Sequence, residues 1–160
     1  MQKIYLLLAI IGSCVLLSCG GARQARQLAY HQSMLTRVAS SEVAAEEKMD
    51  SMATSFIAMM TEGLRIVNPK KGAAYVEKYA RANEGAIDQI LKEVGVWQKD
   101  MNTVEKIAFG VSMIRKPYAK DMVSLVRKFE QKYRQIKFIM GLTKKVKSGL
   151  LTAGLKGLGL

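Results

Sequence analysis

Histidine, cysteine and proline are scarce in this chain of 160 residues, which contains one His, two Cys and two Pro. The lone histidine, His31, excludes metal sites built from several histidines and catalysis that needs more than one of them. Aromatic residues make up only 7% of the chain, whereas methionine occurs 10 times. This composition favours helices packed through aliphatic and methionine side chains over a β-sandwich or a barrel.

Residue groups that could carry out a reaction are also missing. The glycines near the carboxyl end follow no expected strand and precede no expected helix, so they do not predict a phosphate-binding loop. The carboxylates Glu42, Glu46 and Glu47 lack the Glu-x-x-His spacing of metal sites in helical bundles, which favours a solvated helix face. We therefore predict that the chain is not an enzyme and needs no cofactor or metal.

One long apolar run is present, at residues 4–17, and the only charge before it is Lys3. A membrane-spanning helix needs about 20 apolar residues, so this run is short for a permanent span and typical of an export signal. The run ends in the motif Leu16-Leu17-Ser18-Cys19. This motif resembles the lipobox of bacterial lipoproteins. Cys14 is a rival site, but cleavage there would leave a very short apolar core, so we prefer Cys19.

The lipobox resemblance implies removal of a signal peptide at residues 1–18 and attachment of acyl chains, such as palmitate, at Cys19. Several acyl chains anchor a protein durably, whereas a single chain binds only marginally. The next residue is Gly20 and not the Asp that retains lipoproteins of many Gram-negative bacteria in the inner membrane. The resemblance therefore implies an outer-membrane anchor, with the periplasmic side favoured. Residues 19–27 would form the lipidated amino terminus and linker.

The mature chain is long enough for one domain with a modest core, which we place at residues 28–148. Cys19 is the only cysteine left after cleavage, so no disulfide can form within the chain and packing must supply its stability. Residues 149–160 mix leucine with frequent glycine. Because glycine costs about 1 kcal/mol per helical position, we predict a weakly ordered tail that contacts a membrane or a partner.

Apolar residues recur every three or four positions over residues 22–67, which predicts one long helix. His31 and Glu42 interrupt this apolar seam, so the residues before Ser40 form either a polar stalk or a separate helix associated with a serine cap. The element ends at Pro69, because the residue before a proline is driven out of the helical backbone conformation.

A second long helix is predicted over residues 69–116, where a seam from Val76 to Val111 keeps its three- and four-residue spacing. Polar caps near Asn102 would allow a break, but the unbroken spacing favours continuity. Asn83 lies in the seam and is expected to form a hydrogen bond across the bundle that fixes its register.

A third helix is predicted to start or bend at Pro117. The predicted fold is therefore all-α: an elongated bundle of three long antiparallel helices with short turns. A four-helix bundle, with breaks near Ser40 and Asn102, is the alternative. An apolar seam can pack against a helix of the same chain or of a second copy, so the oligomeric state stays open.

Acidic residues are nearly absent from the last third of the chain. The formal net charge is +12, and from Arg115 onward twelve Lys or Arg face only Asp121 and Glu130. This asymmetry indicates an anionic partner, such as lipid head groups or a cell-envelope polymer. Nucleic acid is not expected, because no recognition motif accompanies the charge. The candidate anion-binding residues are Lys120, Arg127, Lys128, Arg134, Lys137, Lys144, Lys145 and Lys147.

These patterns lead to one main hypothesis of function. The chain is expected to be a membrane-anchored envelope lipoprotein with a structural or accessory role, which presents a basic helical arm to an envelope protein or an anionic surface. The alternative is a periplasmic binding module that holds an apolar or anionic ligand between its helices.

Overall fold

The computed structural model describes the backbone of residues 2–152 and the side chains of residues 20–150. Within residues 2–152 there is no β-strand, which confirms the predicted all-α class. The described helices are α1 (Gln2–Ser40), α2 (Ala45–Arg65), α3 (Pro69–Asp100), α4 (Thr103–Arg115), α5 (Ala119–Tyr133) and α6 (Lys137–Thr152).

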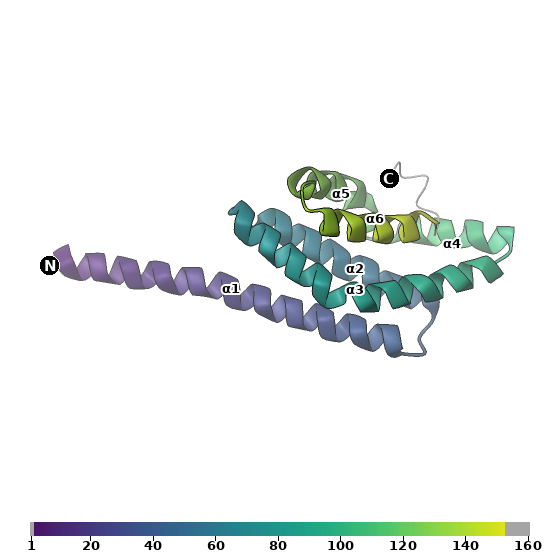
Figure 1. Ribbon diagram of the computed structural model, residues 1–160, viewed down its shortest axis with the longest axis horizontal. Coiled ribbons are helices and arrows are strands. Elements are labelled where there is room, and N and C mark those ends of the chain that lie inside the picture. The colour runs from purple at the N-terminus through teal and green to yellow at the C-terminus, as the bar shows by residue number, and fades with distance from the viewer. Residues whose placement is uncertain (1, 153–160) are drawn as a thin grey trace.

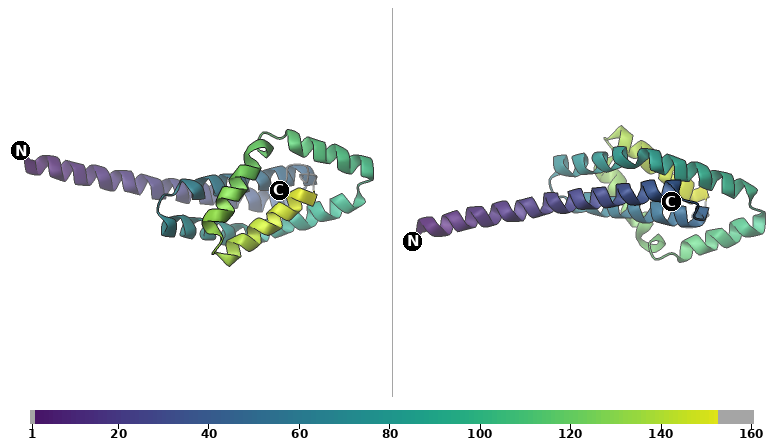
Figure 2. Two further views of the ribbon diagram at one scale, coloured as in Figure 1. Left: turned by 90° about the horizontal axis from the view of Figure 1, so that it is seen from above. Right: turned by 90° about the horizontal axis from the view of Figure 1, so that it is seen from below.

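The helices form layers (Figures 1 and 2). α2 and α3 lie antiparallel in the middle, α1 runs along one side of them, and α5 and α6 cross the other side obliquely. α4 lies at the end of the body far from the amino terminus, whereas the first part of α1 projects beyond the opposite end. We use "body" for everything except this projecting part of α1.

The core lies where the layers meet, and methionine and aliphatic side chains fill it. Burial of such side chains stabilises a fold by roughly 1.5–3 kcal/mol each, so this seam carries most of the stability. The largest fully buried side chains are Leu35, Met49, Met52, Met59, Met60, Tyr79, Ile87, Ile90, Met113, Phe129 and Ile139.

The expected three long helices are not confirmed, because the described helices are interrupted at 41–44, 101–102 and 134–136. The prediction of a continuous helix through Asn102 is wrong. Asn102 accepts a hydrogen bond from the backbone N–H of Glu105 (3.0 Å), and Glu105 Oε2 accepts one from the Asn102 N–H (2.8 Å). This capping box starts α4 as a new helix. The four-helix alternative placed breaks near Ser40 and Asn102 correctly but lacked the break at 134–136.

The break after Ser40 has a different cause from the serine cap that was predicted. The hydroxyls of Ser40 and Ser41 donate to carbonyl oxygens of the preceding turn, at 3.0 Å from Thr36 O and 2.8 Å from Val38 O. These bonds close α1, whereas α2 starts after Ala44 without any side-chain cap. The residues before Ser40 are not a polar stalk, since Leu28, Leu35 and Ala39 of α1 are buried in the core.

The predicted seam is buried in α3 and lost in α4. Val76, Ile87 and Ile90 are 0% exposed, whereas Val104 is 74% exposed and Val111 is 43% exposed. The break at 101–102 turns the next helix about its axis, so Phe109 and Met113 face the body instead.

Two further expectations concern Asn83 and the tail. Asn83 is buried, but its Nδ2 donates to Tyr79 O of the same helix (2.8 Å), so the expected bond across the bundle is wrong. α6 continues to Thr152, so residues 149–152 of the predicted weakly ordered tail are helical. Residues 153–160 lie outside the described part of the chain.

Candidate functional site

The predicted lipidation site, Cys19, belongs to the backbone of α1, and its side chain lies outside the described residues. The residues that follow it, Gly20 and Gly21, line a groove of about 470 Å³ together with Lys71 and Tyr75 of α3. The chain next to Cys19 therefore lies against the first turns of α3, at the end of the body from which α1 projects (Figure 1).

The eight predicted anion-binding residues lie on α5, on α6 and in the turn between them. Seven of these side chains are exposed and Lys147 is half-buried. Those on α5 are exposed because the opposite face of this helix, with Met122, Val126 and Phe129, packs into the core. The candidate basic residues of α5 and its buried apolar residues thus occupy opposite faces of the helix.

Ion pairs divide this predicted set in two. Lys145 Nζ lies 3.0 Å from both carboxylate oxygens of Asp88, and Lys147 Nζ lies 3.8 Å from Glu130 Oε1. Among the residues with described side chains, the other members form no ion pair. We call the six residues without an ion pair the basic face: Lys120, Arg127, Lys128, Arg134, Lys137 and Lys144.

Three polar groups join α4 and α5 to α2, and the sequence analysis did not single them out. Asp50 accepts hydrogen bonds from Lys116 Nζ (2.5 Å) and from the hydroxyl of Tyr118 (2.6 Å). Burial, and next the bond to Asp50, raises the pKa of Tyr118 well above its usual range. The same carboxylate raises the pKa of Lys116. These groups position α4. The partners are more than sixty residues apart in the sequence, so local sequence patterns do not predict their contact.

His31 is more buried than a partly exposed stalk residue would be, at 9% exposure. Its ring lies edge-on to the rings of Tyr30 and Tyr79, with centroid distances of 5.2 and 5.9 Å. Burial lowers the pKa of His31, which favours the neutral imidazole. The side chain is therefore part of the contact between α1 and α3.

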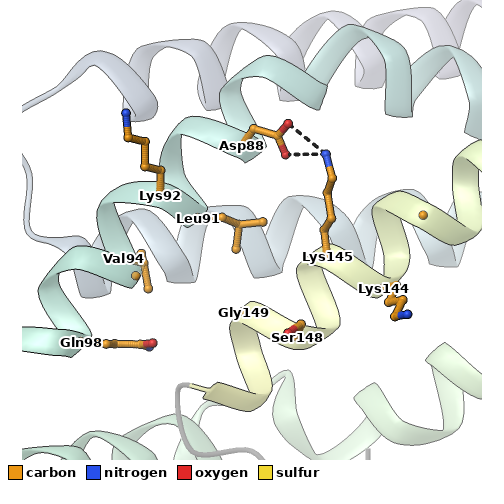
Figure 3. Close-up of a pocket in the computed structure, with 11 residues that line it drawn as sticks. Asp88, Leu91, Lys92, Val94, Gln98, Lys144, Lys145, Ser148 and Gly149 are labelled. Atoms are coloured by element: carbon orange, nitrogen blue, oxygen red, sulfur yellow. Dashed lines mark hydrogen bonds and ion pairs between the residues drawn. The ribbon is translucent and has the colours of Figure 1, made fainter.

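A groove of about 580 Å³ lies between α3 and α6 (Figure 3). Leu91 and Val94 supply apolar surface, and Lys92 and Lys144 supply positive charge. Gln98 is 7% exposed, and its Nε2 finds no hydrogen-bond partner among the described residues. Ligand sites in proteins typically have about 300–1,000 Å³ and combine apolar walls with a few polar groups, as this groove does.

The core between the methionine-bearing helices offers much less room. A cavity lined by Phe56, Met60 and Val126 has about 10 Å³, which is no more than one water needs. The described grooves with room for a ligand therefore lie at the surface, between α1 and α3, between α3 and α6 and along α3 near Trp97, and not among the buried methionines.

The chain has no significant match among protein-family models, curated proteins or solved structures. None of the helices in the described part of the chain has an apolar stretch that would span a bilayer. In the same part of the chain, no three His, Cys, Asp or Glu side chains gather in a way that could hold a metal ion. Two surfaces with recognition chemistry are described: the basic face of α5 and α6 and the groove between α3 and α6.

Proposed function

We propose that the chain is an envelope lipoprotein, anchored through acyl chains on Cys19 in the outer membrane on its periplasmic side. In this proposal it has a structural or accessory role: it binds an envelope protein or an anionic surface and catalyses no reaction. The lipobox-like motif supports the anchor, and the basic face supports the binding.

The basic face is the observation that carries the binding role. Its six cations are exposed, they belong to α5, to α6 and to the turn between them, and none of them forms an ion pair with a described carboxylate. Each basic residue near an anionic surface contributes about 1 kcal/mol, so six of them provide a strong and salt-dependent attraction. Lys145 and Lys147 contribute less, because Asp88 and Glu130 already compensate their charges.

Crosslinking in intact envelopes tests this role. A variant that combines Lys120→Gln, Arg127→Gln, Lys128→Gln and Lys144→Gln is expected to lose its crosslinked partner, whereas the control Lys145→Gln/Lys147→Gln keeps it. Equal crosslinking of both variants would overturn the binding role. Mass spectrometry of the mature amino terminus tests the anchor, and an unmodified residue there would overturn it.

A second candidate function is a ligand-binding module, and the groove between α3 and α6 favours it. The expected ligand is an apolar molecule with an acidic group, because Lys92 and Lys144 flank the apolar surface of Leu91 and Val94. We expect a small molecule to stay bound to the protein through delipidation and to be absent from the Leu91→Asp variant. The matched control is Leu64→Asp, which alters another half-buried leucine outside the groove.

A further inference from the structure

The turn between α2 and α3 presents an apolar side chain to solvent. Val67 is 92% exposed, the highest exposure among the described large apolar residues. It lies between α2, which ends at Arg65, and Asn68, which caps α3 by accepting a hydrogen bond from Lys71 N (3.1 Å). The position of Val67 is therefore fixed by a capped helix and is not that of a frayed end.

Three cations lie close to Val67 along the chain. Arg65, Lys70 and Lys71 lie within four residues of it along the chain, and all three are exposed. Isolated apolar side chains on a surface are ordinary, but an exposed valine with three exposed cations within four residues of it combines the two chemistries of a lipid interface.

Two further cations reach this end from the turn between α5 and α6. Lys132 Nζ donates to Gly63 O (3.0 Å) and Ile66 O (2.9 Å), and Tyr133 Oη donates to Gly63 O (2.5 Å). These bonds hold the end of α5 against the end of α2. Arg134 and Lys137 follow directly and are exposed. The turn between α5 and α6 lies at the same end of the body as the turn between α2 and α3 (Figure 2).

α1 contributes a cation and carries the proposed anchor at this end. Arg23 Nη2 lies 3.7 Å from Glu62 Oε2, and Gln24 Nε2 donates to Glu62 Oε1 (3.4 Å). Glu62 is 8% exposed and Arg23 is largely exposed, and Glu62 compensates part of the charge of Arg23, as Glu130 does for Lys147. The part of α1 that includes Cys19 leaves the body beside the turn between α2 and α3 (Figures 1 and 2).

We propose that this end of the body rests on the membrane that anchors the protein, with Val67 in the interfacial region and the surrounding cations on the phosphates of anionic lipids. We call it the anchor-side tip; its residues are Arg23, Arg65, Val67, Lys70, Lys71, Arg134 and Lys137. The inference rests on the proposed function, because the acyl anchor at Cys19 brings the tip to a lipid surface.

An anionic lipid surface fits the tip better than a protein partner does. A typical protein interface uses about 20–30 residues on each side and has an apolar centre, whereas the tip offers one apolar side chain inside several cations. Each cation near an anionic leaflet contributes about 1 kcal/mol, and the anchor keeps the tip at high local concentration. The tip would therefore orient a body that the acyl chains alone leave free to tilt.

The opposite end of the body provides a matched control. Val104 of α4 is also an exposed valine, at 74%, and lies near the turn between α3 and α4. The nearest charged residues there, Asp100, Glu105 and Lys106, include both signs. Figures 1 and 2 place α4 at the end far from the anchor-side tip.

The test uses the mature lipidated protein in vesicles whose acyl chains are brominated, because bromine quenches tryptophan emission at short range. Val67→Trp and Val104→Trp are each made in a Trp97→Phe background, so each protein carries one tryptophan. We expect Val67→Trp to lose emission in vesicles of equal parts phosphatidylcholine and phosphatidylglycerol, whereas Val104→Trp keeps it. In phosphatidylcholine alone the loss is smaller, and Lys70→Gln/Lys71→Gln reduces it in the mixed vesicles.

The other outcomes separate this inference from the proposed function. If the protein floats with the vesicles and Val67→Trp keeps its emission, the anchor stands and the tip proposal fails. Equal quenching of both variants also overturns the tip. If Val67→Trp is shielded only in native envelopes and never quenched by bromine, the occupant is a protein and the proposal is wrong. A chain that carries no lipid and does not float overturns the proposed function, and the tip with it.

Discussion

α3 and α4 carry the same apolar spacing but use it differently. In α3 the seam residues Val76, Ile87 and Ile90 are fully buried, whereas in α4 the residues in the same frame, Val104 and Val111, are exposed. Two non-helical residues, 101–102, lie between the buried and the exposed parts of the seam. Periodicity therefore tells which side chains share a face, but not whether another element covers that face.

The two helices also differ in how they are held. α3 packs against α1, α2 and α6 along its length, whereas α4 is held by a few specific contacts. Phe109 of α4 meets Trp97 edge-on, with ring centroids 4.8 Å apart, and Met113 is fully buried. α4 is therefore expected to detach under milder conditions than the rest of the body loses its structure.

The largest expected effect on stability comes from a buried residue of α3. Ile87→Ala removes a fully buried side chain of α3, which should lower the free energy of unfolding by about 2–5 kcal/mol. Val104→Ala in α4 should change it by less than about 0.5 kcal/mol, because that side chain is exposed. Urea denaturation followed by circular dichroism measures both. A similar loss in the two variants would mean that α4 is covered in solution.

A smaller loss of stability is expected when a helix cap is removed, and the emission of Trp97 shows which of the two helices is affected. Asn102→Ala removes the cap of α4 and Asn68→Ala that of α3, and each should cost about 1 kcal/mol. Only Asn102→Ala should alter the emission of Trp97, because Phe109 of α4 packs on that ring. Unchanged emission in Asn102→Ala would show that α4 stays docked without its cap.

The smallest expected effect is a pH dependence at the contact between α1 and α3. Burial holds the pKa of His31 below its usual 6.5, so the unfolded chain binds a proton more readily than the folded one as pH falls. Stability from this residue is thus fully present above pH 6.5 and is lost as the pH decreases below it. His31→Gln should flatten the dependence of urea stability on pH between about 7 and 5. An unchanged profile would assign that dependence to other groups.

The sequence predicted the helical class and the buried face of α2 and α3, because these depend on spacing within one helix. Met49, Met52 and Phe56 are buried as the seam predicts. The sequence contains the two residues of the capping box, Asn102 and Glu105, which indicate a helix start. The unbroken apolar spacing through this segment favoured a continuous helix instead. The break at 134–136 has no proline or glycine to mark it.

The candidate surfaces were only partly predictable, for a physical reason. The exposed row on α5 follows from helical spacing, so Lys120, Arg127 and Lys128 lie where expected. The neutralisation of Lys145 by Asp88 depends on how α6 packs on α3, which no local pattern encodes. The anchor-side tip was missed for the same reason, since its residues come from α1, from the turn between α2 and α3, and from the turn between α5 and α6.

The pair Gly20–Gly21 has a mechanical consequence for a lipidated protein. A Cβ on either residue would meet nothing within 4 Å, so neither glycine is required by packing. Each glycine weakens a helix by about 1 kcal/mol relative to alanine, which makes α1 easiest to unwind directly after Cys19. Under the proposed lipidation of Cys19, unwinding at this pair would separate the anchor from the body while the buried contacts of α1 from Leu28 onward stay intact.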